Sequence, residues 1–268
     1  MAKISQIQWT DATWNIARGC RKVDADCKFC YMYRDSMNET RYNPREIKRT
    51  KTVFDLPLKL AVPSKIFTSS LTDFFLEEID EYRNEAWDII RKCPQHTFQI
   101  LTKRPERINQ CLPEGWGFGW PNVWLGTSIG SQKGFYERYP HIINAVSLTK
   151  FISFEPLYEP IDYNVDIQDA VKIDWAIIGG ESGNESRIID GRETQKYRYR
   201  PCKLEWITDL AKELNGYGTN VFIKQLGTHL AKEMGLKDRH GGDMEEWPEE
   251  LRIREFPGVR KDQFFSIV

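Results

Sequence analysis

The sequence lacks long apolar runs and an excess of charge of either sign. No stretch approaches the roughly 18 apolar residues needed to cross a bilayer, and the opening MAKISQIQWTDATW has no apolar centre of the kind found in secretory signals. The 38 basic and 39 acidic side chains leave a formal net charge of -1, so no global field draws the chain toward phosphate backbones or anionic lipid. We therefore predict a cytoplasmic protein with no membrane partner, in which any contact with nucleic acid is local.

Signs of a divided chain are also missing. The sequence contains no internal repeat, low-complexity tract or Ser/Pro-rich linker, although residues 113–121, PEGWGFGWP, form a Gly- and Trp-rich loop. A length of 268 residues fits one barrel-like domain. We predict a single domain over residues 1–268, with a barrel core at about 8–227 and a C-terminal extension at 228–268.

Short β-branched or aromatic runs alternate with amphipathic stretches of helical period. Helices are predicted between the runs, among them Glu81–Lys92 and Lys203–Leu214. The alternation predicts βαβ crossovers and hence a parallel sheet. The strand candidates are Ala12–Ile16, Lys65–Ser69, Thr97–Leu101, Asn122–Gly126, Lys150–Phe154, Asp174–Ile178 and Asn220–Lys224.

The strand candidates are almost entirely apolar, as in SKIFTS, FQIL and WAIIG, which indicates a sheet covered on both faces. The predicted fold class is therefore α/β, with a partial (β/α) TIM-like barrel of six to seven parallel strands favoured over a doubly wound sheet. In both architectures the reactive groups collect at the carboxyl ends of the strands, because the βα loops converge there.

Cysteine is distributed unevenly. Three of the six cysteines, Cys20, Cys27 and Cys30, lie close together directly after the first strand candidate, and so in the first βα loop. A disulfide framework is not expected in a reducing compartment. Three thiolates in one loop can ligate three corners of a four-iron cluster and leave the fourth iron open to a small chelating molecule. The other cysteines are expected to be small buried thiols: Cys93, Cys111 and Cys202.

Two other interpretations of the three cysteines stay open. Zinc could be held by them together with one histidine, but closed zinc sites often use closely spaced ligand pairs. Here a distant histidine would have to fold back, from among His96, His141, His229 and His240. Unligated thiols are the third interpretation, in which neighbouring cations would lower the thiol pKa values and leave reactive thiolates exposed. Those cations are Arg18, Arg21, Lys22 and Lys28.

Segments well beyond the cysteine loop carry a resemblance to a known family. They are IQWTDATWN, FTSSLTDFF, LTKRPER, NVWLGTSI, FISFEPL, WAIIGGESG, RPCKLEWI and VFIKQLG. With the cysteine loop, they resemble a phage and bacterial protein family that has a three-cysteine motif and an unassigned substrate. That family looks like a divergent branch of the radical S-adenosylmethionine (radical SAM) superfamily.

The resemblance implies a cofactor set and a reaction class. It implies a [4Fe-4S] cluster on Cys20, Cys27 and Cys30, S-adenosylmethionine chelated by the open iron, and an external electron donor. Reductive cleavage would then give a 5′-deoxyadenosyl radical that abstracts hydrogen from an unknown substrate. A phage-type family suggests, by analogy, that this substrate is nucleic acid or a nucleotide.

Three features depart from the superfamily pattern. Six residues separate Cys20 from Cys27 where the superfamily has three, although an aromatic, Phe29, still precedes the last cysteine. The GGE segment at 179–181 follows the sixth strand candidate rather than the second, so it is not assigned to methionine binding by name. Residues 184–200, which include the basic-aromatic run KYRYR, look like an insertion that alters substrate access.

Polar side chains and glycines follow the strand candidates at their carboxyl ends. S-adenosylmethionine presents an ammonium, a carboxylate, a sulfonium, ribose hydroxyls and an adenine edge, so its site needs carboxylates, hydroxyls, a cation and bare backbone. We predict that Asp73 binds the ammonium, and that Glu155 and Glu181 bind ribose or substrate. For each residue alone, a solvated loop or a buried ion pair stays open. The predicted cofactor-binding residues are Phe29, Ser69, Asp73, Thr127, Ser128, Gly179 and Gly180, and the predicted catalytic residues are Lys103, Glu155 and Glu181.

The alternative function belongs to another class: a non-catalytic zinc-binding protein that recognises nucleic acid or a partner protein. The stretch 196–203, KYRYRPCK, interleaves aromatics and cations as single-strand binders do. A solvated loop entering a helix at Pro201 is the simpler interpretation of that stretch. Candidates for a residue that quenches the product radical are Tyr31, Tyr33 and Cys202.

Overall fold

One parallel sheet of seven strands forms the centre of the fold. The computed structural model describes residues 5–35, 43–164, 173–183, 188–189, 192–193 and 199–258. All seven strand candidates are confirmed, with ends shifted by a few residues. The strands are β1 (Ala12–Trp14), β4 (Lys65–Thr68), β5 (Thr97–Thr102), β6 (Val123–Ser128), β7 (Thr149–Leu157), β8 (Trp175–Gly180) and β11 (Asn220–Gln225).

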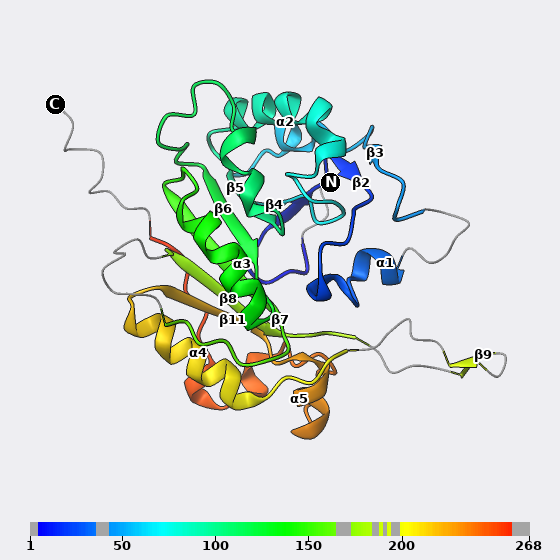
Figure 1. Cartoon of the computed structure of the whole chain (residues 1–268), viewed down its shortest axis with the longest axis vertical. Coiled ribbons are helices and arrows are strands. Elements are labelled where there is room, and N and C mark those ends of the chain that lie inside the picture. The colour runs from blue at the N-terminus through cyan, green and yellow to red at the C-terminus, as the bar shows by residue number, and fades with distance from the viewer. Residues whose placement is uncertain are drawn as a thin grey trace.

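The order of the strands decides the architecture. It is β1-β4-β5-β6-β7-β8-β11, which follows the chain without a reversal. A doubly wound sheet reverses its order at a switch point, so that alternative is excluded. Figure 1 shows the sheet curled into an open half-barrel with helices along its outer side. The α/β class and the half-barrel shape agree with the prediction.

Helices and short strand pairs surround the sheet. The predicted helices at 81–92 and 203–214 are confirmed as α2 and α4, with ends within two residues. The helices are α1 (Tyr31–Asp35), α2 (Asp80–Lys92), α3 (Gln132–Ile143), α4 (Leu204–Gly216) and α5 (Gly227–Glu233). The short strands are β2 (Ala17–Arg18) with β3 (Lys48–Arg49), and β9 (Ile188–Ile189) with β10 (Arg192–Glu193). Most of the KYRYR run lies outside the described residues, as does much of the predicted 184–200 insertion.

Short 3₁₀ helices fill several connections. The link from β5 to β6 contains two of them and the Gly- and Trp-rich loop, where the alternation predicts an α-helix. Pro105 starts one 3₁₀ turn and Pro113 follows the second, and proline interrupts the hydrogen bonds of an α-helix interior. The 3₁₀ helices are η1 (Ala25–Cys27), η2 (Leu56–Lys59), η3 (Glu77–Ile79), η4 (Pro105–Arg107), η5 (Asn109–Cys111), η7 (Met244–Glu246) and η8 (Glu249–Leu251).

Two hydrophobic clusters cover the two faces of the sheet. On the outer face, Trp87 and Ile90 of α2 and Leu210 of α4 pack in the large core together with strand residues. The other face carries an aromatic cluster in which Trp175 stacks on Phe256, with ring centroids 5.4 Å apart. Trp9 near the start of the chain and Phe256 near its end thus help to cover the inner face of the sheet. This explains why the strand sequences are apolar on both sides. Residues 252–256 of the predicted extension therefore pack on the same sheet as the barrel core.

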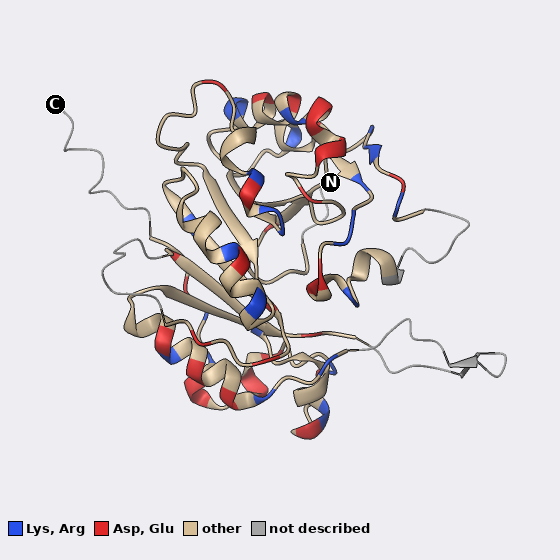
Figure 2. Ribbon diagram, viewed as in Figure 1, with Lys and Arg blue, Asp and Glu red and all other residues tan. Residues whose placement is uncertain are grey.

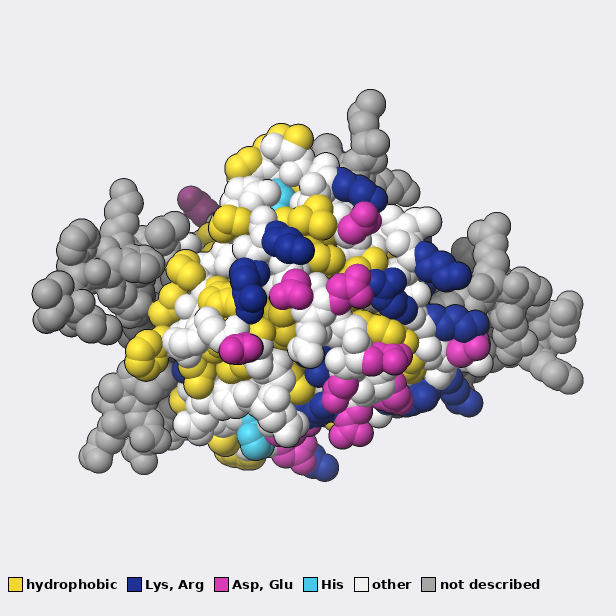
Figure 3. Space-filling model, turned by 90° about the horizontal axis from the view of Figure 1, so that it is seen from above, with side chains coloured by type: hydrophobic (Ala, Val, Ile, Leu, Met, Phe, Trp, Pro, Cys, Tyr) yellow, Lys and Arg dark blue, Asp and Glu magenta, His cyan; other side chains and the backbone are white. Residues whose placement is uncertain are grey.

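Charged side chains of both signs are interspersed over the described part of the fold. Figure 2 shows Lys and Arg beside Asp and Glu along the helices, and the face in Figure 3 carries both signs among apolar side chains. Because the two signs are mixed, a charged partner would have to be recognised by particular residues rather than by a face of one sign.

Among the described residues, no helix is both long and apolar enough to cross a membrane.

Candidate functional site at the carboxyl ends of the strands

The cysteine loop, residues 20–30, lies between β2 and α1 and is fixed at its start by backbone hydrogen bonds. The Gly19 amide donates to Leu71 O at 3.1 Å, and the Cys20 amide donates to Pro44 O at 3.0 Å. Gly19 has a φ of 99°, and a Cβ there would lie 2.3 Å from Glu46 O, so a side chain cannot be placed without moving backbone. The loop therefore begins beside the segment that follows β4, at the carboxyl ends of the strands.

The three thiols of this loop influence one another. Burial, then the negative charge of Asp73, and to a smaller extent thiolates at Cys30 and Cys27, together raise the pKa of Cys20 to about 12, against the lowering effect of Arg104. Burial also raises the pKa of Cys30, against the lowering effect of the Lys103 ammonium. Cations lower both pKa values, but desolvation outweighs them, so the net shift is upward and not downward as the unligated interpretation would require.

Cys27 is 9% exposed, and Cys20 and Cys30 are partly buried. Among the described residues, no group of three or more Cys, His, Asp or Glu side chains is gathered closely enough to hold a metal ion. The mutual effects on pKa nevertheless place the three sulfurs in one neighbourhood. The three predicted thiols therefore lie near one another, but within the described residues they do not form a compact site for a single metal ion.

The loop after β4 holds a strained and unsatisfied residue. Ser69 has a φ of 69°, an unusual conformation for a residue other than glycine. It is 3% exposed, and its hydroxyl has no hydrogen-bond partner among the residues that the structure describes. The same holds for the buried Thr72 hydroxyl. Native proteins leave few buried polar atoms unpaired, and they concentrate backbone strain at functional sites. Ser69, predicted from sequence, therefore stands out in the structure as well.

Asp73 is 5% exposed and joins this loop to the end of β5. Its carboxylate accepts hydrogen bonds from the Thr102 hydroxyl at 2.6 Å and from the Lys103 amide at 2.9 Å. It also accepts one from the Phe75 amide at 3.0 Å, and pairs with Arg104 at 3.1 Å. Arg104 in turn donates to Arg21 O in the cysteine loop at 2.9 Å. Binding of an ammonium by Asp73 stays a prediction, which requires the carboxylate to exchange a partner or share an oxygen.

Glu155 and Lys224 form an ion pair across an intervening strand. Lys224 Nζ lies 2.5 Å from Glu155 Oε1, and the two side chains are 20% and 18% exposed. Gly179 of β8 lies between them, since a Cβ there would contact the Glu155 carboxyl at 3.4 Å. Both β7 and β11 shift register at this point, and such bulges re-aim side chains. Lys224 is thus the partner of the predicted catalytic Glu155.

The two residues after Gly179 also have close neighbours. A Cβ on Gly180 would lie 2.2 Å from Leu226 O, so Gly180 allows the chain after β11 to pass close to β8. Glu181 is 6% exposed and pairs with Arg200 through both carboxylate oxygens, at 2.7 and 2.9 Å. The glycine is therefore required by packing, whatever it does toward a cofactor.

The remaining predicted residues differ in their surroundings. The Thr127 hydroxyl donates to Thr102 O at 2.9 Å inside the sheet wall, and Ser128 is buried at the end of β6. Phe29 is partly buried, with the Arg200 guanidinium 5.9 Å from its ring. The Lys103 ammonium makes no hydrogen bond or ion pair with the residues that the structure describes. Within the described part of the chain, Lys103 therefore offers an unpaired cation close to Cys30.

Three of the histidines have hydrogen-bond partners outside the cysteine loop. His96 lies before β5, at the opposite edge of the sheet, with its ring nitrogens near Ser64 N and Pro57 O. His229 and His240 contact Cys202 O and the Thr228 hydroxyl.

Two of the other cysteines match the prediction of buried thiols. They are Cys93 and Cys202, which are 1% and 0% exposed. Cys111 is only partly buried and contacts Arg83 Nη1 at 3.3 Å, so the prediction is wrong there.

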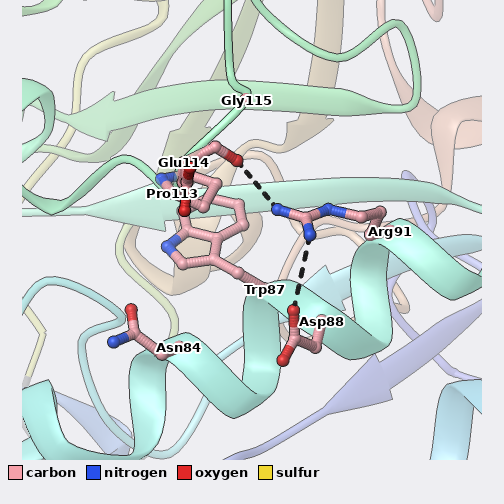
Figure 4. Close-up of a pocket in the computed structure, with 7 residues that line it drawn as sticks. All are labelled: Asn84, Trp87, Asp88, Arg91, Pro113, Glu114 and Gly115. Carbon is pink, nitrogen blue, oxygen red and sulfur yellow. Dashed lines mark hydrogen bonds and ion pairs between the residues drawn. The ribbon is translucent and has the colours of Figure 1, made fainter.

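A cavity of about 510 Å³ lies elsewhere on the molecule, between α2 and the loop that starts at Pro113. Figure 4 shows the Arg91 guanidinium reaching Asp88 and the carbonyl of Glu114, with Trp87 beside them. Its lining residues belong to the predicted helix at 81–92 and loop at 113–121, but none of them was predicted as a site residue. It shares no residue with the site at the strand ends.

The fold and this site define an α/β half-barrel protein with a three-thiol loop over the carboxyl ends of its strands. The chain belongs to the family described as "Protein of unknown function (DUF5131)", which matches residues 4–263. No curated protein and no solved structure matches the chain.

Proposed function

We propose that this protein is a radical SAM enzyme. Cys20, Cys27 and Cys30 would ligate a [4Fe-4S] cluster, and S-adenosylmethionine would lie between the cluster and the strand ends. When bound and given one electron by an external donor, the pair would supply a 5′-deoxyadenosyl radical able to take hydrogen from a substrate. The observation that carries the proposal is the position of a three-thiol loop beside the strained, unsatisfied Ser69 at the carboxyl edge of a half-barrel.

The donor set fits such a cluster. Thiolates are the usual ligands of iron–sulfur clusters, and three of them leave one iron open. Arg104 and Lys103 offset the negative charge of thiolates at Cys20 and Cys30. A cluster is wider than one ion, so its ligands need not be gathered as closely as around zinc.

The side chains at the strand ends supply groups suited to a zwitterionic nucleoside. The free hydroxyls of Ser69 and Thr72 can donate and accept hydrogen bonds. The unpaired Lys103 ammonium can bind a carboxylate. The Glu155–Lys224 pair can change partners when a polar substrate enters, because neither charge is far from solvent. These residues would bind and orient the ligands, while the cysteine loop covers them from water.

The test is anaerobic reconstitution of the full chain with iron and sulfide. We expect about four iron and four sulfide per chain, and production of 5′-deoxyadenosine from S-adenosylmethionine on addition of a reductant. Cys27→Ser should abolish both, because two thiolates remain for a cluster that uses three. Cys111→Ser is the matched control, since Cys111 is a partly buried thiol outside the loop.

Two results would contradict the proposal. One is stoichiometric zinc without iron in the wild-type protein, which would support a structural metal site. The other is a loaded cluster with bound S-adenosylmethionine that is never cleaved under reduction, which would leave a binding protein.

A further inference from the structure

Two buried ion pairs, Asp26–Arg138 and Glu181–Arg200, tie the middle of the cysteine loop to segments outside it. The long gap between Cys20 and Cys27 contains Asp26, whose side chain is 1% exposed. Its Oδ2 accepts hydrogen bonds from Arg138 Nη1 at 2.8 Å and the Gly130 amide at 3.1 Å. Its Oδ1 accepts one from the Tyr158 hydroxyl at 2.6 Å. The extra residues of the gap therefore place a carboxylate directly before Cys27, among donors from three other segments.

Arg200 holds the same loop from another side. Its Nη1 donates to Ala25 O, next to Asp26, at 2.8 Å. The rest of its guanidinium forms a two-point pair with Glu181 after β8, at 2.7 and 2.9 Å. Fork-shaped pairing of this kind fixes orientation as well as distance. Arg200 therefore ties the cysteine loop to the end of β8.

Tyr158 joins the two anchors. Its hydroxyl donates to Asp26, and the Arg200 guanidinium lies 3.7 Å from the centre of its ring. Burial and the hydrogen bond to Asp26 raise the pKa of Tyr158 to about 12, so the phenol keeps its proton at neutral pH. The segments after β6, β7 and β8 are thus connected to one short stretch of the cysteine loop, residues 25 and 26.

We propose that Asp26 and Arg200 are positioning residues that hold Cys27 at a fixed place above the strand ends. This inference rests on the proposed function for its meaning, since the thiol would be a cluster ligand. Charged partners behind metal ligands commonly set ligand geometry, and their loss costs roughly 10- to 100-fold in metal affinity or activity. The six-residue gap then has a purpose: it carries the residue that aligns the second cysteine.

The first arm of the test needs no metal. Cys27 in the full-length apo-protein is alkylated under native conditions, and its modification is followed by mass spectrometry. Asp26→Asn should speed this reaction, because Asn loses the negative charge that pairs with Arg138. The buried Cys202, 0% exposed, reports on the fold in the same sample and should stay unreactive.

The second arm loads ferrous iron and sulfide and measures the rate of cluster loss to a chelator, together with the electron paramagnetic resonance spectrum of the reduced cluster. Asp26→Asn and Arg200→Lys should lose the cluster roughly 10- to 100-fold faster and broaden the spectrum. Tyr158→Phe keeps the ring under Arg200 but removes the hydrogen bond to Asp26, so it should speed cluster loss less than Asp26→Asn does. If Asp26→Asn does not fold, the milder Tyr158→Phe variant still tests the inference.

The matched control is Glu78→Gln. Glu78 also binds the cysteine loop, through Arg21 at 2.7 Å, but this pair is 49% and 39% exposed and contributes little. Wild-type behaviour of Asp26→Asn in both arms would overturn the inference. A wild-type protein that takes up no iron would overturn the proposed function instead, while the alkylation of Cys27 would still decide whether Asp26 positions the loop.

Discussion

Gly180→Ala separates a packing role for the GGE segment from a cofactor role. A Cβ at position 180 would lie 2.2 Å from Leu226 O, 2.9 Å from Leu226 C and 3.1 Å from Gly227 Cα. All three atoms are backbone, and the chain there is held by hydrogen bonds from Leu226 N to Gly241 O at 2.8 Å and from Gly227 N to His240 O at 3.0 Å. The contact cannot be relieved by turning a flexible side chain.

The expected loss in the free energy of unfolding of Gly180→Ala follows from this geometry. Forcing extra atoms into a packed region costs about 1–3 kcal/mol, and a contact this short with backbone on both sides belongs at the upper end. A loss of about 3 kcal/mol corresponds to a fall in melting temperature of roughly 6–12 °C for a chain of this size. Gly216→Ala is the matched control: nothing lies within 4 Å, and the site is the last residue of α4. There the same change should stabilise by up to about 1 kcal/mol.

Thermal and urea unfolding of the apo-protein, followed by circular dichroism, measures both variants. Because no metal or S-adenosylmethionine is present, the loss of a cofactor contact cannot change the result. A Gly180→Ala protein as stable as the wild type would refute the close approach of β8 to Leu226. The predicted role of Gly180 in cofactor binding would then be the main explanation for a glycine at this position.

Two further outcomes are expected. Ser69→Gly should raise the free energy of unfolding by roughly 1 kcal/mol, because it relieves a positive φ and removes a buried unpaired hydroxyl. In calorimetric titration of the reconstituted protein it should weaken S-adenosylmethionine binding; a destabilised variant with unchanged affinity would contradict both parts. Lys224→Met should cost roughly 1–3 kcal/mol by leaving Glu155 unpaired, and adding Glu155→Gln should recover most of it. Effects of these two changes that simply add, within about 0.5 kcal/mol in urea unfolding, would argue against direct coupling.

The elements of the fold were predictable because their signals are local. Strands such as β5 and β8 are short apolar runs, and α2 and α4 have apolar residues at helical spacing. The link between β5 and β6 broke the predicted alternation because prolines and glycines there interrupt a helix. The aromatic contact of Trp175 with Phe256 was not predictable, since it joins residues that share no local pattern.

The residues of the candidate site also fall into those that local sequence signals predict and those that they do not. The cysteine loop and Ser69 could be located because each follows a recognisable strand, and parallel strands end at one edge of a sheet. Asp26 and Arg200 had no such signal, because their partners are distant in the chain: Asp26 is 104 residues from Gly130, and Arg200 is 175 residues from Ala25. An acidic residue inside an unusually long gap between cysteines is the one hint that the sequence offered.

By itself, the sequence determined the seven strands of the central sheet and the helices α2 and α4, that the strands run parallel, and at which edge the three thiols lie. The tertiary structure alone decided the strand order, which polar groups are paired, and that burial raises the pKa values of Cys20 and Cys30 despite nearby cations. The physical reason is range: periodicity and turn chemistry act over a few neighbouring residues, whereas desolvation and ion pairing depend on every segment that folds against a group.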